Sequence, residues 1–246
     1  MVETELDGDV RIVRIARPEK RNCVNSATAE ALLDAFLAFE AAADEKVAIL
    51  TGDETAFCAG ADLKDLPRLR PSGPLGPTRL QLSKPVIAAI EGWCVAGGVE
   101  LAVWCDLRVA GRSAQIGCLE RRWGVPLIDG GTQRLPRIVG LGRALDLVLT
   151  GRQIGADEAF AMGLVNRVVD DGTALATAVD LGRQIASFPW KCVESDRMCV
   201  YEGLGVPLAD ALENEDRRGR EVIFDPGFAA GVERFTNRAG HPHPGR

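Results

Sequence analysis

Short apolar runs that alternate with amphipathic helical stretches limit this chain to few folds. The runs lie at residues 10–15, 46–52, 85–92 and 106–111. Each is bounded by Gly, Pro or Asp, as is typical of buried β-strands. Between the first two runs, Ser26 or Thr28 can cap a helix whose apolar residues recur at helical spacing. This strand–helix–strand alternation predicts an α/β fold.

The second half of the chain, from residue 141 onward, follows a helical pattern. Helical stretches end at Gly151 and Gly163, and another stops before Pro189. A charged helical stretch without a strand pattern comes next. Because 246 residues with 46% apolar content can bury one sizeable core, we expect a core at 1–190 and a helical oligomerisation region at 191–246.

Histidine is nearly absent, which narrows the possible chemistry. The only two histidines, His241 and His243, lie in a Pro/Gly-rich tail. This excludes Ser-His-Asp and Cys-His hydrolases and HExxH metalloproteases. With Tyr201 as the single tyrosine, carboxylates must carry any acid–base chemistry. The seven cysteines form no CxxC pair, so we expect reduced core thiols rather than disulfides or a zinc site.

Charge and hydropathy exclude two classes of partner. The formal charge is −6 and the basic residues are scattered, so nucleic acid is not an expected partner. No apolar window approaches the roughly 18 residues of a membrane span, and the N-terminus has no signal-peptide pattern. We therefore expect a cytoplasmic protein without a membrane partner, and no metal or redox cofactor is implied.

Two glycine-containing turns suggest a site for a developing negative charge. In the first, small residues lead to Ala61; in the second, Gly97 precedes an apolar helix that carries one acid, Glu100. Amides at a helix start have no partner within the helix. A pair of such N–H groups can hold an oxyanion, each donor contributing about 2.7 to 4 kcal/mol. Ala61 and Gly97 are the candidates, although either turn alone could be purely structural.

The motifs around these turns resemble those of the crotonase family, the enoyl-CoA hydratase/isomerase superfamily. The resemblance covers nearly the whole chain. Its strongest elements are AFCAGADLK (56–64), GWCVAGGVELAVWCDLRVA (92–110), GVPLIDGGTQRLPRIVG (124–140) and LTGRQIGADEAFAMGLVNRVV (149–169). It implies an α/β spiral of ββα turns with a helical C-terminal region, assembled as a homotrimer or a dimer of trimers.

The resemblance also implies roles for particular residues. The amides of Ala61 and Gly97 would form an oxyanion hole around a thioester carbonyl, and Glu100 and Glu120 match the two hydratase glutamates. The implied reaction is syn addition of water to a 2-enoyl-CoA, with coenzyme A as part of the substrate. The implied coenzyme A contacts are Cys23, Ala59, Asp62, Leu63, Lys64 and Arg238.

Two departures from the family pattern leave alternatives open. Arg121 and Arg122 follow Glu120 where family hydratases usually carry aliphatic residues, and they would lower its pKa if they face it. Asp129 stands where dienoyl-CoA isomerases of the family carry a catalytic aspartate, although it could also cap a helix beginning near Gly131. The alternatives are therefore a double-bond isomerase or a non-catalytic acyl-CoA-binding protein. A dinucleotide-dependent oxidoreductase is disfavoured, because the glycine fingerprint is incomplete.

Overall fold

The computed structural model describes residues 1–237 and divides the chain into two compact units. The first is Met1–Arg183, and the second begins at Gln184. Arg238, His241 and His243 lie outside the described residues. Within the described part, no helix is both long enough and apolar enough to cross a membrane.

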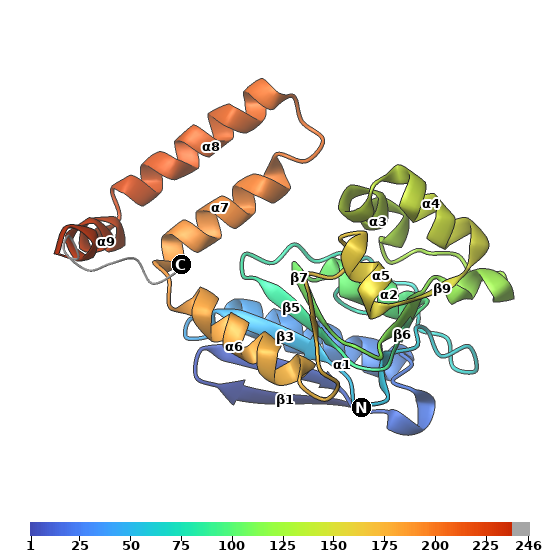
Figure 1. The fold of residues 1–246 in the computed structure, drawn as a ribbon. Helices are drawn as coiled ribbons and strands as arrows, with labels where there is room; N and C mark the ends of the chain where they lie inside the picture. The colour runs from blue at the N-terminus through green and yellow to red at the C-terminus, as the bar shows by residue number, and fades with distance from the viewer. Residues whose placement is uncertain (238–246) are drawn as a thin grey trace. The chain divides into compact units, whose positions relative to one another are not determined.

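The larger sheet of the first unit has the strand order β1-β2-β3-β5-β7-β10 (Figure 1). Only β1 and β2 pair in antiparallel fashion, and the other neighbours are parallel. The four predicted runs form the four central strands. The bounds are β1 Val2–Asp7, β2 Val10–Ile15, β3 Val47–Thr51, β5 Val86–Ile90, β7 Leu107–Gly111 and β10 Arg167–Val169.

A smaller sheet of four three-residue strands has the order β4-β6-β8-β9. Its members are β4 Ala56–Cys58, β6 Trp93–Val95, β8 Gln115–Gly117 and β9 Gln153–Gly155. The strands β3, β5 and β7 of the larger sheet are each followed in sequence by a strand of the smaller one. The sequence pattern did not predict these short strands, but their repeated alternation produces the expected spiral.

Helices complete the first unit, and their ends mostly lie where expected. Helix α4 ends before Gly151, which has a φ of 57°, and Gly163 follows α5 with a φ of 81°. Helix α1 is capped by Asn25, whose side chain accepts a hydrogen bond from the Thr28 amide. The expected cap at Ser26 or Thr28 was wrong, because these residues lie one and three positions after the observed N-cap. The helices are η1 Pro18–Lys20, α1 Ser26–Ala41, α2 Gly97–Trp104, η2 Leu119–Trp123, α3 Gly131–Val139, α4 Leu141–Thr150, α5 Ala156–Ala161 and α6 Ala174–Ala186, whose last three residues belong to the second unit.

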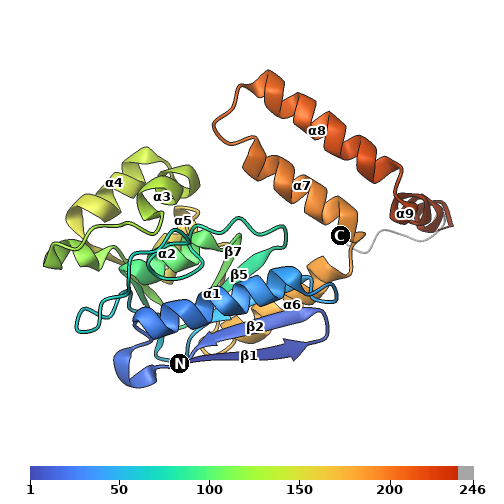
Figure 2. The ribbon, with the colours of Figure 1, turned by 180° about the vertical axis from the view of Figure 1, so that it is seen from behind.

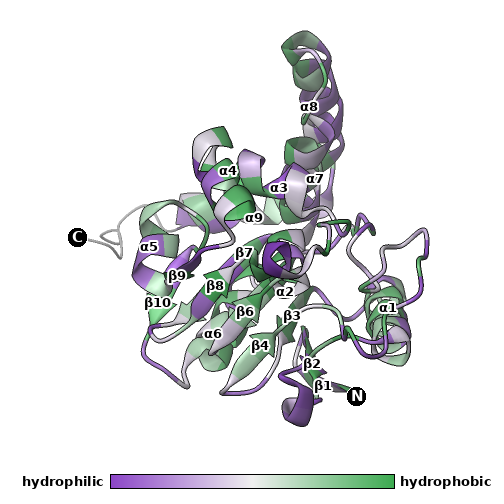
Figure 3. Cartoon of the chain, turned by 90° about the vertical axis from the view of Figure 1, so that its right-hand side faces the viewer, coloured by the Kyte–Doolittle hydropathy of each residue, from purple (hydrophilic) through white to green (hydrophobic). Residues whose placement is uncertain are grey.

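Helix α2 lies in sequence between β6 of the smaller sheet and β7 of the larger sheet. All eight of its residues are buried, including the acid Glu100. Its start packs so tightly on β4 that a Cβ on Gly98 would lie 2.0 Å from the Cys58 carbonyl oxygen. In Figure 3 the strands β3 and β4 carry the hydrophobic colour, in keeping with their full burial. The apolar environment of α2 therefore surrounds an ionisable group.

The described part of the second unit is helical. It contains α7 Trp190–Glu202, α8 Leu208–Ile223 and α9 Pro226–Asn237 (Figure 2). Glu202 and Arg218 join α7 to α8 through an ion pair with an Nη2–Oε1 distance of 2.5 Å. No strand occurs between residues 184 and 237. The oligomerisation role expected for this region stays a prediction.

Candidate active site

A cavity of about 810 Å³ in the first unit brings the predicted site residues together. Apolar side chains of the loop at 65–78, among them Leu66, Leu69 and Leu75, form part of its wall. This loop, which contains four prolines and two glycines, therefore flanks the site. Every predicted site residue that the structure describes lines this cavity: Cys23, Ala59, Ala61, Asp62, Leu63, Lys64, Gly97, Glu100, Glu120 and Asp129.

The amides of Ala61 and Gly97 lie at two backbone segments in van der Waals contact. A Cβ on Gly97 would stand 3.6 Å from the Ala61 nitrogen, and one on Gly60 would stand 2.7 Å from the Gly97 nitrogen. Val24 donates to Gly60 and accepts from Asp62, so Ala61 between them directs its own amide to the other side. Gly97 is the first residue of α2. Within residues 1–237, neither amide donates to a protein acceptor.

Ala96, the residue before Gly97, has a φ of 53° and a ψ of −128°. This backbone conformation costs a non-glycine residue on the order of 1–3 kcal/mol and is concentrated at functional sites. The Ala96 amide is held by the Gly117 carbonyl at 2.9 Å. The strain thus fixes the direction in which α2 begins, and with it the Gly97 amide.

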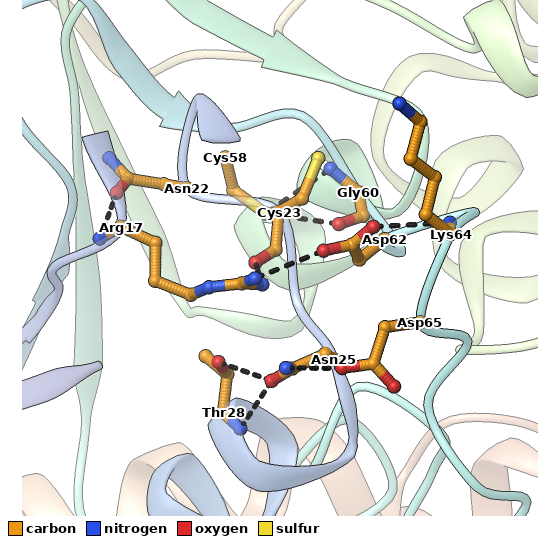
Figure 4. A network of polar contacts seen from close by, with 10 residues as sticks. All are labelled: Arg17, Asn22, Cys23, Asn25, Thr28, Cys58, Gly60, Asp62, Lys64 and Asp65. Atoms are coloured by element: carbon orange, nitrogen blue, oxygen red, sulfur yellow. Dashed lines mark hydrogen bonds and ion pairs between the residues drawn. The ribbon is translucent and has the colours of Figure 1, made fainter. Parts of the chain in front are cut away.

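A partly buried ion pair orders the segment that carries Ala61 (Figure 4). Arg17 Nη2 lies 3.0 Å from Asp62 Oδ2, and Arg17 Nη1 donates to the Cys23 carbonyl at 2.6 Å. Although burial opposes it, the hydrogen bonds from Arg17 and the Lys64 amide hold the pKa of Asp62 below its ordinary value. The family motif did not identify Arg17, because it comes from a distant part of the sequence.

Glu100 combines burial with two hydrogen bonds to one oxygen. Glu100 is only 3% exposed to solvent. Its Oε1 atom accepts hydrogen bonds from the backbone amides of Asp129 at 2.9 Å and Gly131 at 2.8 Å. Burial raises the pKa of Glu100 to about 7, with smaller contributions from the charges of Asp129 and Glu120. Two amide donors favour the ionised form, so Glu100 is suited to accept a proton near neutral pH.

Glu120 is a buried carboxyl without a hydrogen-bond donor. Both of its oxygens are buried, and neither has a partner within the described residues. Burial raises the pKa of Glu120, although its own backbone amide and the positive charge of Arg121 act in the opposite direction. Arg121 and Arg122 point elsewhere: they donate to the carbonyls of Val148 and Gly151. Neither guanidinium therefore forms an ion pair with Glu120 within the described residues, and the charge of Arg121 lowers the pKa of Glu120 less than burial raises it.

Asp129 does not cap helix α3, and that expectation was wrong. The N-cap is Gly130, without a side-chain hydrogen bond. Instead, Asp129 Oδ1 accepts from the Leu75 amide at 3.0 Å and from the Thr78 hydroxyl. Sequence reasoning missed Leu75 and Thr78, because no local pattern indicates that this loop returns to Asp129.

The end of the cavity near Cys23 has a different character. Lys20 and Lys64 supply cations to the cavity lining there. The amides of Cys23, Ala59 and Asp62 already donate to protein carbonyls. These three amides are therefore occupied, and the lysine ammonium groups are the charged donors in the cavity lining at this end. Arg238, the other expected cation, lies outside the described residues.

Comparisons with known proteins agree with this geometry. The chain matches the family described as Enoyl-CoA hydratase/isomerase over residues 5–238. It is 34% identical to an enoyl-CoA hydratase of Mycobacterium tuberculosis, over 95% of this chain and 92% of that protein. It is 37% identical to a short-chain-enoyl-CoA hydratase of Clostridium acetobutylicum, over 86% and 85%.

Solved structures extend the likeness to three dimensions. An enoyl-CoA hydratase from Mycobacterium marinum has a TM-score of 0.92 and 33% identity, with 96% of each chain covered. The expected α/β crotonase-like fold is thereby confirmed. Together, the match over nearly the whole chain and the shared fold place this protein in the enoyl-CoA hydratase/isomerase family.

Proposed function

We propose that this protein is an enoyl-CoA hydratase, which adds water to the double bond of a 2-enoyl-CoA thioester. One observation carries the proposal: two buried carboxyl groups, Glu100 and Glu120, line the same cavity as the amides of Ala61 and Gly97, which have no acceptor in the described part of the chain. Carboxyls for proton transfer beside amides for an oxyanion are the groups that enolate chemistry on a thioester needs.

The two glutamates have different environments and therefore different roles. In the hydration direction, Glu100 takes a proton from water as the water oxygen bonds to C3. The electron pair of the double bond moves onto the thioester as an enolate, whose oxygen is held by Ala61 and Gly97. Glu120 then gives its proton to C2, and the carbonyl re-forms. The sum is one water added, and the glutamates return to their starting protonation through solvent.

The pH dependence of this reaction follows from the protonation states of Glu100 and Glu120. Activity needs one proton shared between Glu100 and Glu120, so kcat/KM should rise and then fall with pH. Because burial raises the pKa of Glu100 to about 7, the acidic limb is expected near neutrality. The apparent values belong to the coupled pair rather than to either residue.

For the coenzyme A part of the substrate, we propose the end of the cavity near Cys23. Lys64 and Lys20 would meet phosphate oxygens there. Backbone around Cys23, Ala59, Asp62 and Leu63 would hold the adenine, and Arg238 would add a further cation. A substrate placed this way has its charged head beside the lysines and its acyl group beside Glu100 and Glu120.

Double-bond isomerisation is the second candidate, because Asp129 adds a third carboxyl to the cavity. Such an isomerase would move a proton along the acyl chain without consuming water. A binding protein without activity is disfavoured, since it would have no use for buried carboxyls at a cost in stability.

One experiment separates these functions. The protein is incubated with crotonyl-CoA and, in separate reactions, with a 3-enoyl-CoA and a 3,5-dienoyl-CoA. We expect crotonyl-CoA to gain the mass of one water molecule. An unchanged mass with a displaced double bond in the other substrates would establish an isomerase, and no change in any of the three would favour the binding protein.

We further propose that copies of the chain assemble as a trimer or a dimer of trimers through residues 191–246. Exposed apolar side chains support this, because monomeric proteins rarely leave so many together. Within the described part of this region they are Val200, Leu204, Val206, Leu208, Leu212, Ile223, Phe224, Phe228, Val232 and Phe235. Light scattering of the purified protein gives the subunit number, and a monomer at micromolar concentration would contradict the proposal.

A further inference from the structure

The end of the loop at 65–78 is fastened to Asp129 by a buried contact. Thr78 is fully buried and Leu75 nearly so, and both donate hydrogen bonds to Asp129 Oδ1. Gly73 completes the turn with a φ of 104°; a Cβ there would stand 1.9 Å from Thr78 Oγ1 and 2.8 Å from Asp129 Oδ1. The backbone therefore closes on the aspartate at a point where only glycine fits.

The main chain of Asp129 holds the proton acceptor proposed above. Its amide donates to Glu100 Oε1 at 2.9 Å. Its carbonyl accepts from Arg134 Nη1 at 3.0 Å, and Arg134 Nη2 donates to the Thr78 carbonyl at 2.7 Å. These bonds form a closed network in which the side chain of Asp129 holds the loop and its backbone holds Glu100.

The same loop reaches the proposed oxyanion site. A Cβ on Gly97 would stand 2.6 Å from Leu75 Cδ1, so the Leu75 side chain lies directly against the start of α2. The Leu75 amide is the group that Asp129 binds. Moving Asp129 would thus displace both the wall above Gly97 and the carboxylate of Glu100.

We propose that Asp129 is a positioning residue, which fastens the loop at 73–78 over Gly97 and orients Glu100, rather than a carrier of substrate protons. The inference rests on the hydratase function proposed above. It gives the third carboxyl a role that needs no isomerase, because Asp129 Oδ1 holds the Leu75 amide and the Thr78 hydroxyl. The chain would then use an aspartate to organise its acyl pocket.

The charges around the network give this role a measurable signature. Asp129 and Glu120 are the acids that face Glu100, and Arg79 and Arg134 are the cations that act on Asp129. The negative charge of Asp129 opposes ionisation of Glu100. Replacing Asp129 with a neutral residue of the same shape should therefore lower the pKa of Glu100.

The test compares Asp129→Asn and Thr78→Val with a matched control, Thr51→Val. Thr51 is also buried, and its hydroxyl donates to the Ala89 carbonyl, away from the cavity lining. We expect Asp129→Asn to move the acidic limb of the kcat/KM profile for crotonyl-CoA about one pH unit lower, with plateau kcat reduced less than about 10-fold. Thr78→Val should lower kcat/KM about 10-fold, mainly through KM, and Thr51→Val should change neither.

Two results would overturn the proposal. A loss of about 100-fold or more in kcat at every pH for Asp129→Asn would make Asp129 a proton carrier. Equal kcat/KM for Thr78→Val and Thr51→Val would mean that the fastening has no effect on the site. If the wild-type protein hydrates none of the substrates, the hydratase proposal fails independently of this one. The positioning role of Asp129 can then still be tested by carbon-13 NMR titration of the Glu100 carboxyl, because the pKa of Glu100 must be lower in Asp129→Asn than in the wild type.

Discussion

Replacing Glu100 with glutamine is expected to stabilise the folded chain at alkaline pH while it removes activity. Burial raises the pKa of this carboxyl from 4.5 to about 7 in the folded state. The folded chain thus binds the proton more tightly, so the stabilisation is present below pH 4.5 and is lost as pH rises through about 7. Each pH unit between these values corresponds to about 1.4 kcal/mol, which makes the cost of ionised Glu100 about 3 kcal/mol.

Glutamine keeps an oxygen for the amides of Asp129 and Gly131 but carries no charge. We expect Glu100→Gln to match the wild type near pH 4.5 and to exceed its unfolding free energy by about 3 kcal/mol at pH 8. Urea denaturation at both pH values measures this. Glu30→Gln, an exposed position on α1, serves as the control with no pH-dependent gain. If the unfolding free energies of Glu100→Gln and the wild type differed by the same amount at both pH values, the reasoning would be refuted.

Three further predictions concern other parts of the site. Glu120→Gln should lower crotonyl-CoA turnover by about 100-fold while calorimetry still detects acyl-CoA binding; unchanged turnover would remove Glu120 from the mechanism. Gly98→Ala should cost about 2 kcal/mol by thermal unfolding, because its Cβ would lie 2.0 Å from a carbonyl of β4. Gly142→Ala, which meets nothing within 4 Å, is its control, and equal melting temperatures would contradict the packing argument. Arg17→Met should lose about 3 kcal/mol of stability; a double-mutant cycle with Asp62→Asn that gives no coupling would disprove the ion pair's role.

Much of the fold follows from local sequence properties. The four apolar runs became the four central strands of the larger sheet, because continuous apolar residues favour strands covered on both faces. The short strands of the smaller sheet were not predicted, because three residues give too little periodicity to detect. Helix ends marked by Gly151 and Gly163 were predicted correctly, since glycine readily adopts the left-handed conformation that ends a helix.

The candidate site divides in the same way. Glu100 could be predicted as a site residue from its local sequence, because it is the one acid in an apolar helical stretch. Glu120 could be predicted only from the resemblance to known hydratases. The direction of Arg121 and Arg122 could not be predicted, since it depends on carbonyls at the end of α4 that are distant in sequence. The partner of Asp129 depended likewise on where the loop at 65–78 returns.

By itself, the sequence determined which chemistry is available: carboxylates without histidine, glycine turns with free amides, and an α/β pattern to carry them. These are properties of residue type and local spacing. Only the tertiary structure decided that the Ala61 and Gly97 segments touch, that the carboxyl oxygens of Glu120 have no hydrogen-bond partner among residues 1–237, and that Asp129 binds Thr78. Each of these depends on contacts between distant segments, and such contacts exist only after the core has packed.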